Sequence, residues 1–257
     1  MIQSTWDLID DPALDGETNM AVDGRLLDEV EQSDTPMTIL RFYSWARPTV
    51  SLGRNQKMEK AVDLEFCAAQ GIDVVHRPTG GRAVLHDDEL TYAVASNDAA
   101  SFDGGSLYGT YRRISEALTA GYRRLGIEAV LAPDTHRGPK PRDGRDDPCF
   151  VSPSRYELMF RGRKIVGSAQ RRLRRGFLQH GSMLITCNRD LLAQATRLAD
   201  RSVLDDEMAG LAECLTAPPT VDSMVSAFKA AFIEYFTIDF KPPPDPGQAP
   251  GRDRLSA

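Results

Sequence analysis

The chain has 257 residues, of which 41% are hydrophobic and 26% charged, and its formal net charge is −6. This composition is typical of a globular protein with one sizeable core. The negative charge disfavours general nucleic-acid binding, and no apolar run approaches the roughly 20 residues of a membrane helix. The N-terminus lacks the features of a signal peptide, and the four cysteines have no metal-ligand spacing. We therefore expect a cytoplasmic protein with free thiols, no metal site, and no nucleic-acid or membrane partner.

Hydrophobic periodicity predicts helices and strands mixed along the chain. In the helix over 16–32 the apolar side chains share one face, and Asn19 and Asp23 are expected largely off that face. In the helix over 107–125 an apolar stripe that begins at Leu107 is expected in the core. In chain order, the pattern predicts a strand at 6–9, a helix at 16–32, strands at 37–43 and 49–53, a helix at 62–70, strands at 72–75, 83–85 and 90–94, a helix at 107–125, strands at 127–131, 156–160, 164–170 and 177–185, and helices at 190–198 and 221–236.

Two segments have no such periodicity. Residues 133–148 are dominated by proline, glycine and charge, and are expected to form a surface loop. The proline- and glycine-rich residues 241–257 are expected to form a disordered tail. We therefore expect one domain over residues 1–240, followed by this tail.

The most informative stretch covers residues 76–94, HRPTGGRAVLHDDELTYAV. Gly80 and Gly81 have no Cβ, so the backbone can turn tightly there and a ligand can lie directly on it. Arg77 and Arg82 flank the glycines with positive charge. Two glycines between strands are also typical of an ordinary hairpin. The combination of two arginines, two glycines and a histidine favours a ligand-binding loop.

The string RPTGGRAVLHDDELTYAV resembles the signature loop of the biotin/lipoate protein ligase and octanoyltransferase superfamily, R-R-x-[ST]-G-G-x-x-V-x-H-D. His76 replaces the first family arginine, and Arg82 replaces a third glycine, as in the octanoyltransferase branch. Similarity continues in NMAVDGRLLDEV and RFYSWARPTVSLGRNQ, and spans roughly residues 5–240. The resemblance implies a single α/β (α+β) domain of the biotin/lipoate ligase type, in which a mixed, largely antiparallel sheet is packed with helices.

Cys149 is the candidate nucleophile, and Lys164 is the candidate cation beside it. A lone cysteine is more often structural, and a lysine after a turn is usually solvated, but a nearby cation stabilises the reactive thiolate. The segments around the two residues, CFVSPSRYE and GRKIVGSAQ, resemble the cysteine-dependent octanoyltransferases. In that family the lysine contacts the acyl carbonyl and lowers the cysteine pKa. The resemblance therefore implies that both residues are catalytic.

Other residues are expected to border the substrate. The glycine loop and Arg77 would shape an acyl tunnel and place backbone N–H groups near the developing oxyanion. His86 and His180 could each serve as a general base, although a histidine at a strand end is more often structural. The expected substrate-binding residues are Arg77, Thr79, Gly80, Gly81, Arg82, His86, Gly167, Ser168, Ala169, His180 and Gly181.

A basic run follows the candidate lysine strand. It is typical of a solvated hairpin, and it would also suit an acidic partner such as an acyl carrier protein or a lipoyl domain. The run consists of Arg171, Arg172, Arg174 and Arg175.

The resemblance implies an octanoyltransferase of lipoate biosynthesis. Octanoyl-acyl carrier protein would acylate Cys149, and a lysine of a lipoyl domain, such as glycine cleavage H protein or 2-oxoacid dehydrogenase E2, would then take the acyl group. No cofactor is expected for this reaction. Three alternatives stay open: an ATP-dependent lipoate–protein ligase, which would use ATP and magnesium, an octanoyl amidotransferase between lipoyl domains, and an inactive carrier-binding module.

Overall fold

The computed structural model describes residues 4–132 and 156–242 of the chain. The predicted loop over 133–148, the candidate nucleophile Cys149 and the predicted tail from residue 243 onward lie outside the described residues. Within the two described ranges, no helix is long and apolar enough to cross a bilayer.

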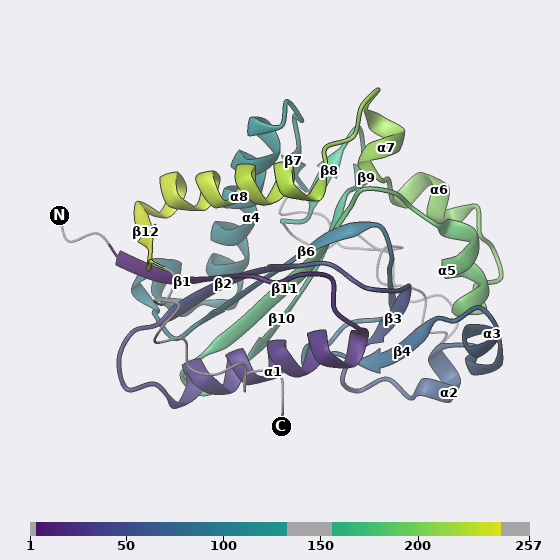
Figure 1. The fold of residues 1–257 in the computed structure, drawn as a ribbon, viewed down its shortest axis with the longest axis horizontal. Coiled ribbons are helices and arrows are strands. Elements are labelled where there is room, and N and C mark those ends of the chain that lie inside the picture. Colours follow the sequence, from purple (N-terminus) through teal and green to yellow (C-terminus); the bar gives the residue numbers. More distant parts are fainter. Residues whose placement is uncertain (1–3, 133–155, 243–257) are drawn as a thin grey trace.

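A six-stranded mixed sheet runs through the centre of the molecule (Figure 1). Neighbouring strands are antiparallel from β10 to β2, and parallel from β2 through β1 to β12. The sheet is therefore mixed and largely antiparallel, as predicted. Its strands in spatial order are β10 (Val166–Arg172), β11 (Phe177–Leu184), β6 (Glu89–Ser96), β2 (Thr38–Tyr43), β1 (Ser4–Asp10) and β12 (Ile238–Phe240).

Helices cover both faces of this sheet. Helix α1 (Gly16–Gln32) lies along one face, and α4 (Leu107–Arg124) and α8 (Val221–Phe236) lie on the other (Figure 1). Because side chains alternate along a strand, Phe42 of β2 packs in the cluster with α8, whereas Tyr43 packs in the cluster with α1. The two faces of the sheet thus belong to two separate apolar clusters.

Two three-stranded sheets flank the large one. In the first, β3 (Thr49–Leu52) pairs with β4 (Asp73–His76) on one side and with β5 (Val84–His86) on the other. The glycine loop therefore crosses over β3 and is not a hairpin. The second sheet contains β7 (Val130–Leu131), β8 (Leu158–Phe160) and β9 (Arg163–Lys164). The remaining elements are α2 (Met58–Ala61), α3 (Leu64–Ala69), the 3₁₀ segment η1 (Ala100–Gly105), α5 (Arg189–Ala195), α6 (Val203–Glu207) and α7 (Leu211–Cys214).

The predicted strand over 164–170 is wrong as a single element. The chain leaves one sheet and enters another at Ile165, whose N–H donates to Leu158 O at 3.0 Å and whose carbonyl accepts from Leu184 N at 3.2 Å. Leu107 was expected in the core and is 46% exposed, because it is the first residue of α4. Several short elements, including β12, carry too little periodicity to be predicted.

Candidate active site

A narrow pocket lies between the glycine loop and strands β10 and β11. It encloses about 370 Å³ of empty space, counting the part that opens to solvent. Seven of the predicted substrate-binding residues line it: Arg77, His86, Gly167, Ser168, Ala169, His180 and Gly181. The pocket is completed by Met20, Tyr43, Ser51, Val84, Thr91 and Ser182.

The glycine loop packs closely on the end of β3. Gly81 has a φ of 97°, which favours glycine, and Thr79 O accepts a hydrogen bond from Arg54 N at 2.9 Å. A Cβ on Gly53 would lie 2.0 Å from the Gly81 carbonyl oxygen. The absence of a side chain at Gly53 therefore lets the loop approach the strand.

Arg77 is buried and holds this loop in shape. Its guanidinium donates to Ser51 O at 2.8 Å, to Gly80 O at 2.8 Å and to Arg82 O at 2.7 Å. Its side chain borders the pocket, but these donors face backbone carbonyls of the loop and of β3. Among the predicted loop residues, Thr79, Gly80, Gly81 and Arg82 do not line the pocket.

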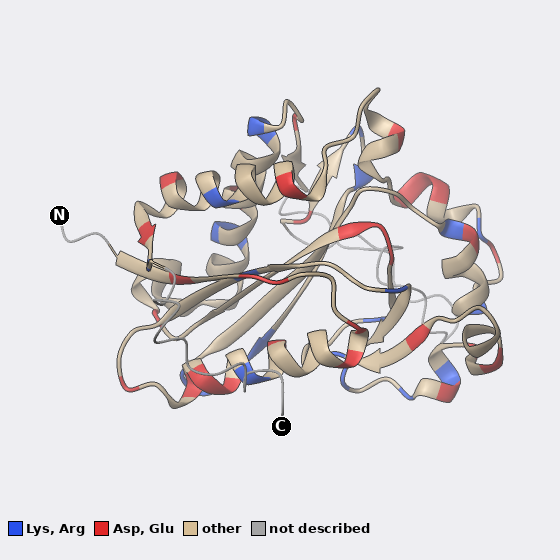
Figure 2. Cartoon of the chain, in the orientation of Figure 1, with Lys and Arg blue, Asp and Glu red and all other residues tan. Residues whose placement is uncertain are grey.

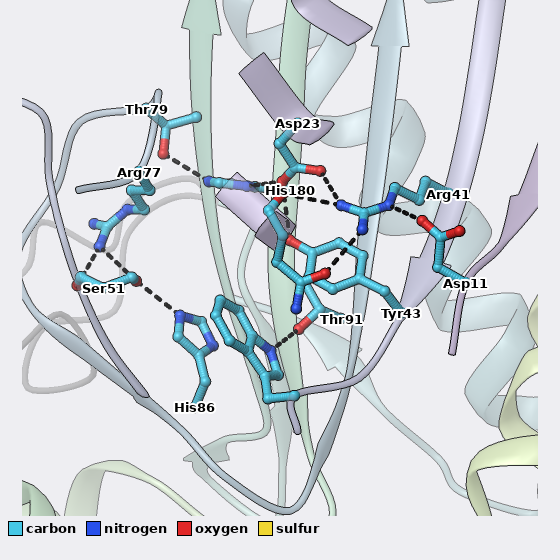
Figure 3. Close-up of polar contacts among 12 residues, drawn as sticks. Asp11, Asp23, Arg41, Tyr43, Ser51, Arg77, Thr79, His86, Thr91 and His180 are labelled. Atoms are coloured by element: carbon cyan, nitrogen blue, oxygen red, sulfur yellow. Dashed lines mark hydrogen bonds and ion pairs between the residues drawn. The ribbon is translucent and has the colours of Figure 1, made fainter. Parts of the chain in front are cut away.

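A buried polar network underlies one wall of the pocket (Figure 3). Asp23 accepts from Arg41 Nη1 at 2.8 Å and from the Tyr43 hydroxyl at 2.9 Å, and it contacts His180 Nδ1 at 2.7 Å. His180 Nε2 in turn lies 2.7 Å from Thr79 Oγ1. The network therefore ties α1 and the central sheet to the glycine loop.

Burial and charge set the protonation of this network. Burial raises the pKa of Asp23, but the His180 hydrogen bond and the positive charges outweigh it, and the net pKa is lowered. Burial lowers the pKa of His180 below its usual value, against the opposing effect of Asp23. At neutral pH the pair is accordingly an ionised carboxylate and a neutral imidazole, whose Nδ1–H donates to Asp23 and whose Nε2 accepts from Thr79.

The prediction that Asn19 and Asp23 lie off the packed face of α1 is wrong. Both residues are 0% exposed. Arg41 Nη2 donates to Asn19 Oδ1 at 2.8 Å, next to its contact with Asp23. Their spacing of four residues places both side chains on the same face of the helix, where the Arg41 guanidinium satisfies them.

A second histidine occupies the opposite wall. His86 stacks on Trp45, with ring centroids 4.0 Å apart and an angle of 12° between the rings. Its Nδ1 lies 2.8 Å from Glu89 Oε1. Its Nε2 lies 2.7 Å from Ser51 Oγ (Figure 3). Glu89 also accepts hydrogen bonds from Trp45 Nε1 and from the hydroxyls of Thr91 and Ser182.

Lys164 is buried, contrary to the solvated position that is usual for a lysine after a turn. Its side chain is 1% exposed, and its Nζ lies 2.6 Å from Glu157 Oε1, which is itself buried. Arg161 and Gly162, with φ values of 50° and 83°, form the tight turn between β8 and β9 that brings the two residues together. Gly167, three residues beyond Lys164, then enters the pocket wall.

Among the residues that the structure describes, no group of three or more His, Cys, Asp and Glu residues is arranged to hold a metal ion. Three cysteines fall in these ranges, namely Cys67, Cys187 and Cys214, and none of them forms a disulfide. Burial raises the pKa of the Cys187 thiol to about 12, which makes it a poor nucleophile.

Comparison with known proteins places this geometry in a family. A family model described as the lipoyl protein ligase A/B catalytic domain matches residues 15–233. The chain belongs to this family. Its fold is shared by a crystal structure of lipoate-protein ligase A bound with ATP, at 25% identity and a TM-score of 0.71 over 94% of this chain and 89% of the other. A bi-partite lipoate protein ligase from Thermoplasma acidophilum has the same fold, with 22% identity and a TM-score of 0.73 over 93% of this chain and 87% of the other.

Within the lipoyl protein ligase A/B family, the chain resembles proteins named octanoyltransferase LipM. The protein from Moorella thermoacetica is 38% identical over 253 residues, which is 94% of this chain and 90% of that protein. The protein from Geobacillus kaustophilus is 38% identical over 251 residues, again 94% of this chain and 90% of the relative. The similarity therefore extends over nearly the whole length of both relatives.

Three of the four arginines in the basic run donate hydrogen bonds to other residues of the fold. Arg171 Nη1 donates to Pro78 O at 3.3 Å, and Arg172 donates to Gly105 O and Thr110 Oγ1. Arg175 donates to Ser33 O at 2.7 Å and pairs with Asp34. Arg174 and Arg175 are exposed, and the docking role suggested for these arginines stays a prediction.

Sequence reasoning missed the residues that orient the two pocket histidines. Arg41 offered a signal, since a charged residue inside the apolar strand TILRFY must have a buried partner. The sequence offered no comparable signal for Ser51 or Glu89, whose roles arise only when β3, β5 and β6 come together. In the described part of the chain, charged residues lie mainly on the helices and loops around the sheet (Figure 2).

Proposed function

We propose that this protein transfers an octanoyl group from octanoyl-acyl carrier protein to a lysine of a lipoyl domain. The observation that carries the proposal is the similarity to octanoyltransferases LipM at 38% identity over 90% of the relatives' length. The archaeal ligase that shares the fold is described together with its E2 lipoyl domain, and a lipoyl domain is the acceptor that we propose here. The reaction needs neither ATP nor a metal ion, because the thioester of the donor supplies the activation.

Cys149 is the proposed nucleophile. Its thiolate attacks the thioester carbonyl of the donor, the carrier thiol leaves, and an octanoyl-cysteine remains on the enzyme. The amine of the target lysine then attacks that intermediate and releases the amide product. Such a sequence gives ping-pong kinetics, with carrier protein released before the lipoyl domain reacts.

Lys164 is proposed to stabilise the Cys149 thiolate and to orient the acyl carbonyl. Support comes from its burial, since a cation held away from water acts more strongly on a nearby anion than a solvated one does. The wall of small residues at Gly167, Ser168 and Ala169 supports a path for the acyl chain along β10. The backbone N–H groups of Gly80 and Gly81 are the proposed donors to the developing oxyanion.

The decisive experiment is intact-protein mass spectrometry of the enzyme mixed with octanoyl-acyl carrier protein, without ATP and without acceptor. We expect a gain of one octanoyl group that hydroxylamine removes and that Cys149→Ala abolishes. Cys214→Ala serves as a matched control, because that cysteine lies in the apolar cluster beyond the pocket and should leave the adduct intact. An adduct that persists in Cys149→Ala would reject the proposed nucleophile.

An ATP-dependent lipoate–protein ligase is the second candidate. The observation that favours it is the fold shared with the ATP-bound lipoate-protein ligase A at 25% identity. Under this alternative the wild-type enzyme forms no octanoyl-cysteine, and it modifies the lipoyl domain only when free acid, ATP and magnesium are supplied. Product formed from the carrier thioester without ATP would exclude it.

A further inference from the structure

The proposed transfer step requires a base. A lysine amine has a pKa of about 10.4 and is almost fully protonated at neutral pH, whereas only the neutral amine can attack an acyl carbonyl. The lysine of the lipoyl domain must therefore lose a proton before it reacts. This inference rests on the proposed function, and it asks which group of the pocket accepts that proton.

His180 is poorly arranged for this task. Its Nε2 contacts Thr79 Oγ1, and Thr79 does not border the pocket, whereas Ser51, which is equally buried, does. Its other partner, Asp23, already pairs with the buried cation of Arg41. Burial also lowers the pKa of His180, which disfavours the cationic form that a base must reach.

His86 has the arrangement that His180 lacks. Both His86 and its partner Ser51 line the pocket, and Ser51 Oγ lies 2.7 Å from His86 Nε2. Because Glu89 can only accept, the Nδ1–H of His86 donates to it at 2.8 Å, and Nε2 presents its lone pair to the Ser51 hydroxyl. Ser51, His86 and Glu89 thus form a hydrogen-bonded chain of hydroxyl, imidazole and carboxylate, as in sites where a third group orients the base.

Neutral donors surround the Glu89 carboxylate beside His86. In residues 4–132 and 156–242, the other groups that donate to Glu89 are the Trp45 indole and the hydroxyls of Thr91 and Ser182, all of them neutral. Within these ranges, the imidazole of His86 is therefore the one titratable group that contacts the Glu89 carboxylate. Two further titratable groups lie near the imidazole: Arg77, which donates to Ser51 Oγ at 3.2 Å, and His180.

We propose that Ser51 and His86 form the proton-accepting pair for the acceptor lysine, with Glu89 as a positioning residue. The Ser51 hydroxyl passes its proton to His86 Nε2 and takes one from the lysine ammonium. The neutral amine then attacks the octanoyl carbonyl, the N–C bond forms and the C–S bond to Cys149 breaks. The second amine proton leaves with the Cys149 sulfur as the thiol, and His86 returns its proton to water after the product departs.

The test separates the two half-reactions in His86→Gln, whose amide keeps a polar contact but cannot act as a base. Octanoyl-enzyme is formed from octanoyl-acyl carrier protein and isolated, and its decay is then followed by intact mass spectrometry after addition of a lipoyl domain. We expect transfer to lysine to fall by about 10²- to 10⁴-fold, the usual range for loss of a general base, and acylation of Cys149 to slow far less.

Hydroxylamine provides the matched control, because it is uncharged at neutral pH and needs no base. Octanoyl-enzyme of His86→Gln should react with hydroxylamine as fast as wild type does, while its reaction with the lysine remains slow. Ser51→Ala, which removes only the hydroxyl, should give the same pattern if the larger change at His86 impairs folding. A purely structural role would slow both nucleophiles together.

Three results overturn the proposal. Transfer to lysine at the wild-type rate in both variants would show that the pair accepts no proton. An equal loss with lysine and with hydroxylamine would show that it only shapes the pocket. If wild-type enzyme forms no octanoyl-cysteine, the proposed function fails first and this inference falls with it, whereas the other two results leave the proposed function intact.

Discussion

Asp23 joins three buried groups beside the pocket. Its two oxygens serve Arg41, Tyr43 and His180 at 2.7–2.9 Å, and its side chain is fully buried. Arg41 also stacks over the Tyr43 ring, with its guanidinium carbon 3.8 Å from the ring centroid. A change at Asp23 therefore acts on the cation, the phenol and the imidazole at once.

Replacing Asp23 with Asn should lower the free energy of unfolding by about 3–5 kcal/mol, because the buried guanidinium of Arg41 loses its most enclosed counter-charge. Urea denaturation at pH 7 measures this difference. Asp34→Asn is the control, since that carboxylate is 95% exposed and its pair with Arg175 should contribute less than about 1 kcal/mol.

The same residues predict how stability varies with pH. The pKa of Asp23 is lowered below 3.8, so its stabilisation is present above that pH and is lost as the pH falls through the folded-state value. The pKa of His180 is also lowered, below 6.5, so the unfolded chain takes up that proton first and acidification below pH 6.5 costs further stability. Wild type should therefore lose stability steadily from pH 7 to pH 3, and Asp23→Asn should lose less below pH 5. A flat wild-type profile would contradict this assignment.

The candidate residues differ in how far the sequence could place them. The resemblance selected Lys164, His86 and His180 by motif, and the structure gives each of them a buried carboxylate partner. Two of these partners are near in sequence, since Glu89 lies three residues after His86 and Glu157 meets Lys164 across the turn between β8 and β9. Asp23 could not be predicted as the partner of His180, because α1 and β11 meet only in the folded protein.

Among the elements, the glycine loop takes its shape from contacts with the neighbouring strand β3 and with Gly53 at its end. It closes over β3 only because Gly53 has no side chain, and its carbonyls are held by the Arg77 guanidinium. The loop itself was predictable from its two glycines and flanking strands. Its crossing over β3 was not, since the parallel pairing of β3 with β4 is a long-range contact.

Replacing Gly53 with Ala should therefore displace the loop. The new Cβ would meet the Gly81 carbonyl oxygen, a backbone atom that cannot rotate away. We expect the octanoyl transfer rate to fall by at least about tenfold and the unfolding free energy to fall by about 1–3 kcal/mol. Both are measured with the purified variant, by mass spectrometry of the acyl-enzyme and by urea denaturation.

Gly24→Ala provides the matched control for this change. Gly24 lies inside α1 with no atom within 4 Å of the position of a Cβ. The same substitution there should raise the unfolding free energy by about 0.5–1 kcal/mol, because alanine favours the helix, and should leave transfer unchanged. Equal transfer rates in the two variants would show that the loop tolerates displacement.

Long elements with strong periodicity were predicted closely. The helices expected at 16–32 and 221–236 are α1 and α8 with the same limits, and most strands agree within a few residues. The errors lie where tertiary contacts decide, as at Ile165, where the chain changes sheets. Helices α3 and α5 agree with the helices predicted at 62–70 and 190–198 within a few residues, whereas α2, α6, α7 and β12 are too short for periodicity to reveal.

In the whole molecule, the central sheet lies between the larger apolar cluster and most of the pocket. Helices α4 and α8 lie on one side of the sheet and α1 lies on the other (Figure 1). The larger apolar cluster contains side chains of α4 and α8, whereas α1 contributes Met20 to the pocket wall and Asp23 to the polar network. Phe228 belongs to that cluster, and its ring centroid lies 5.1 Å from that of Tyr122. Its ring also packs against Gly121, which has no side chain. The larger apolar cluster and most of the pocket therefore lie on opposite faces of one sheet.

Phe228→Ala should accordingly destabilise the protein without altering its chemistry. We expect the unfolding free energy to fall by about 3–5 kcal/mol, as for other buried phenylalanines. At a temperature where circular dichroism finds the variant folded, its rate of octanoyl transfer should stay within about twofold of wild type. A large loss of rate in the folded variant would show that the two faces are coupled.

The pairing of β1 with β12 joins the beginning and the end of the described chain, with Ser4 opposite Ile238 and Trp6 opposite Phe240. During synthesis on the ribosome, the outer edge of β1 stays unpaired until residues 238–240 of β12 have been made. Until then an unpaired strand edge is open to other nascent chains, which is the geometry that promotes aggregation. Residues Ser4 to Trp6 therefore gain their outer neighbour only after residues 238–240 have been synthesised.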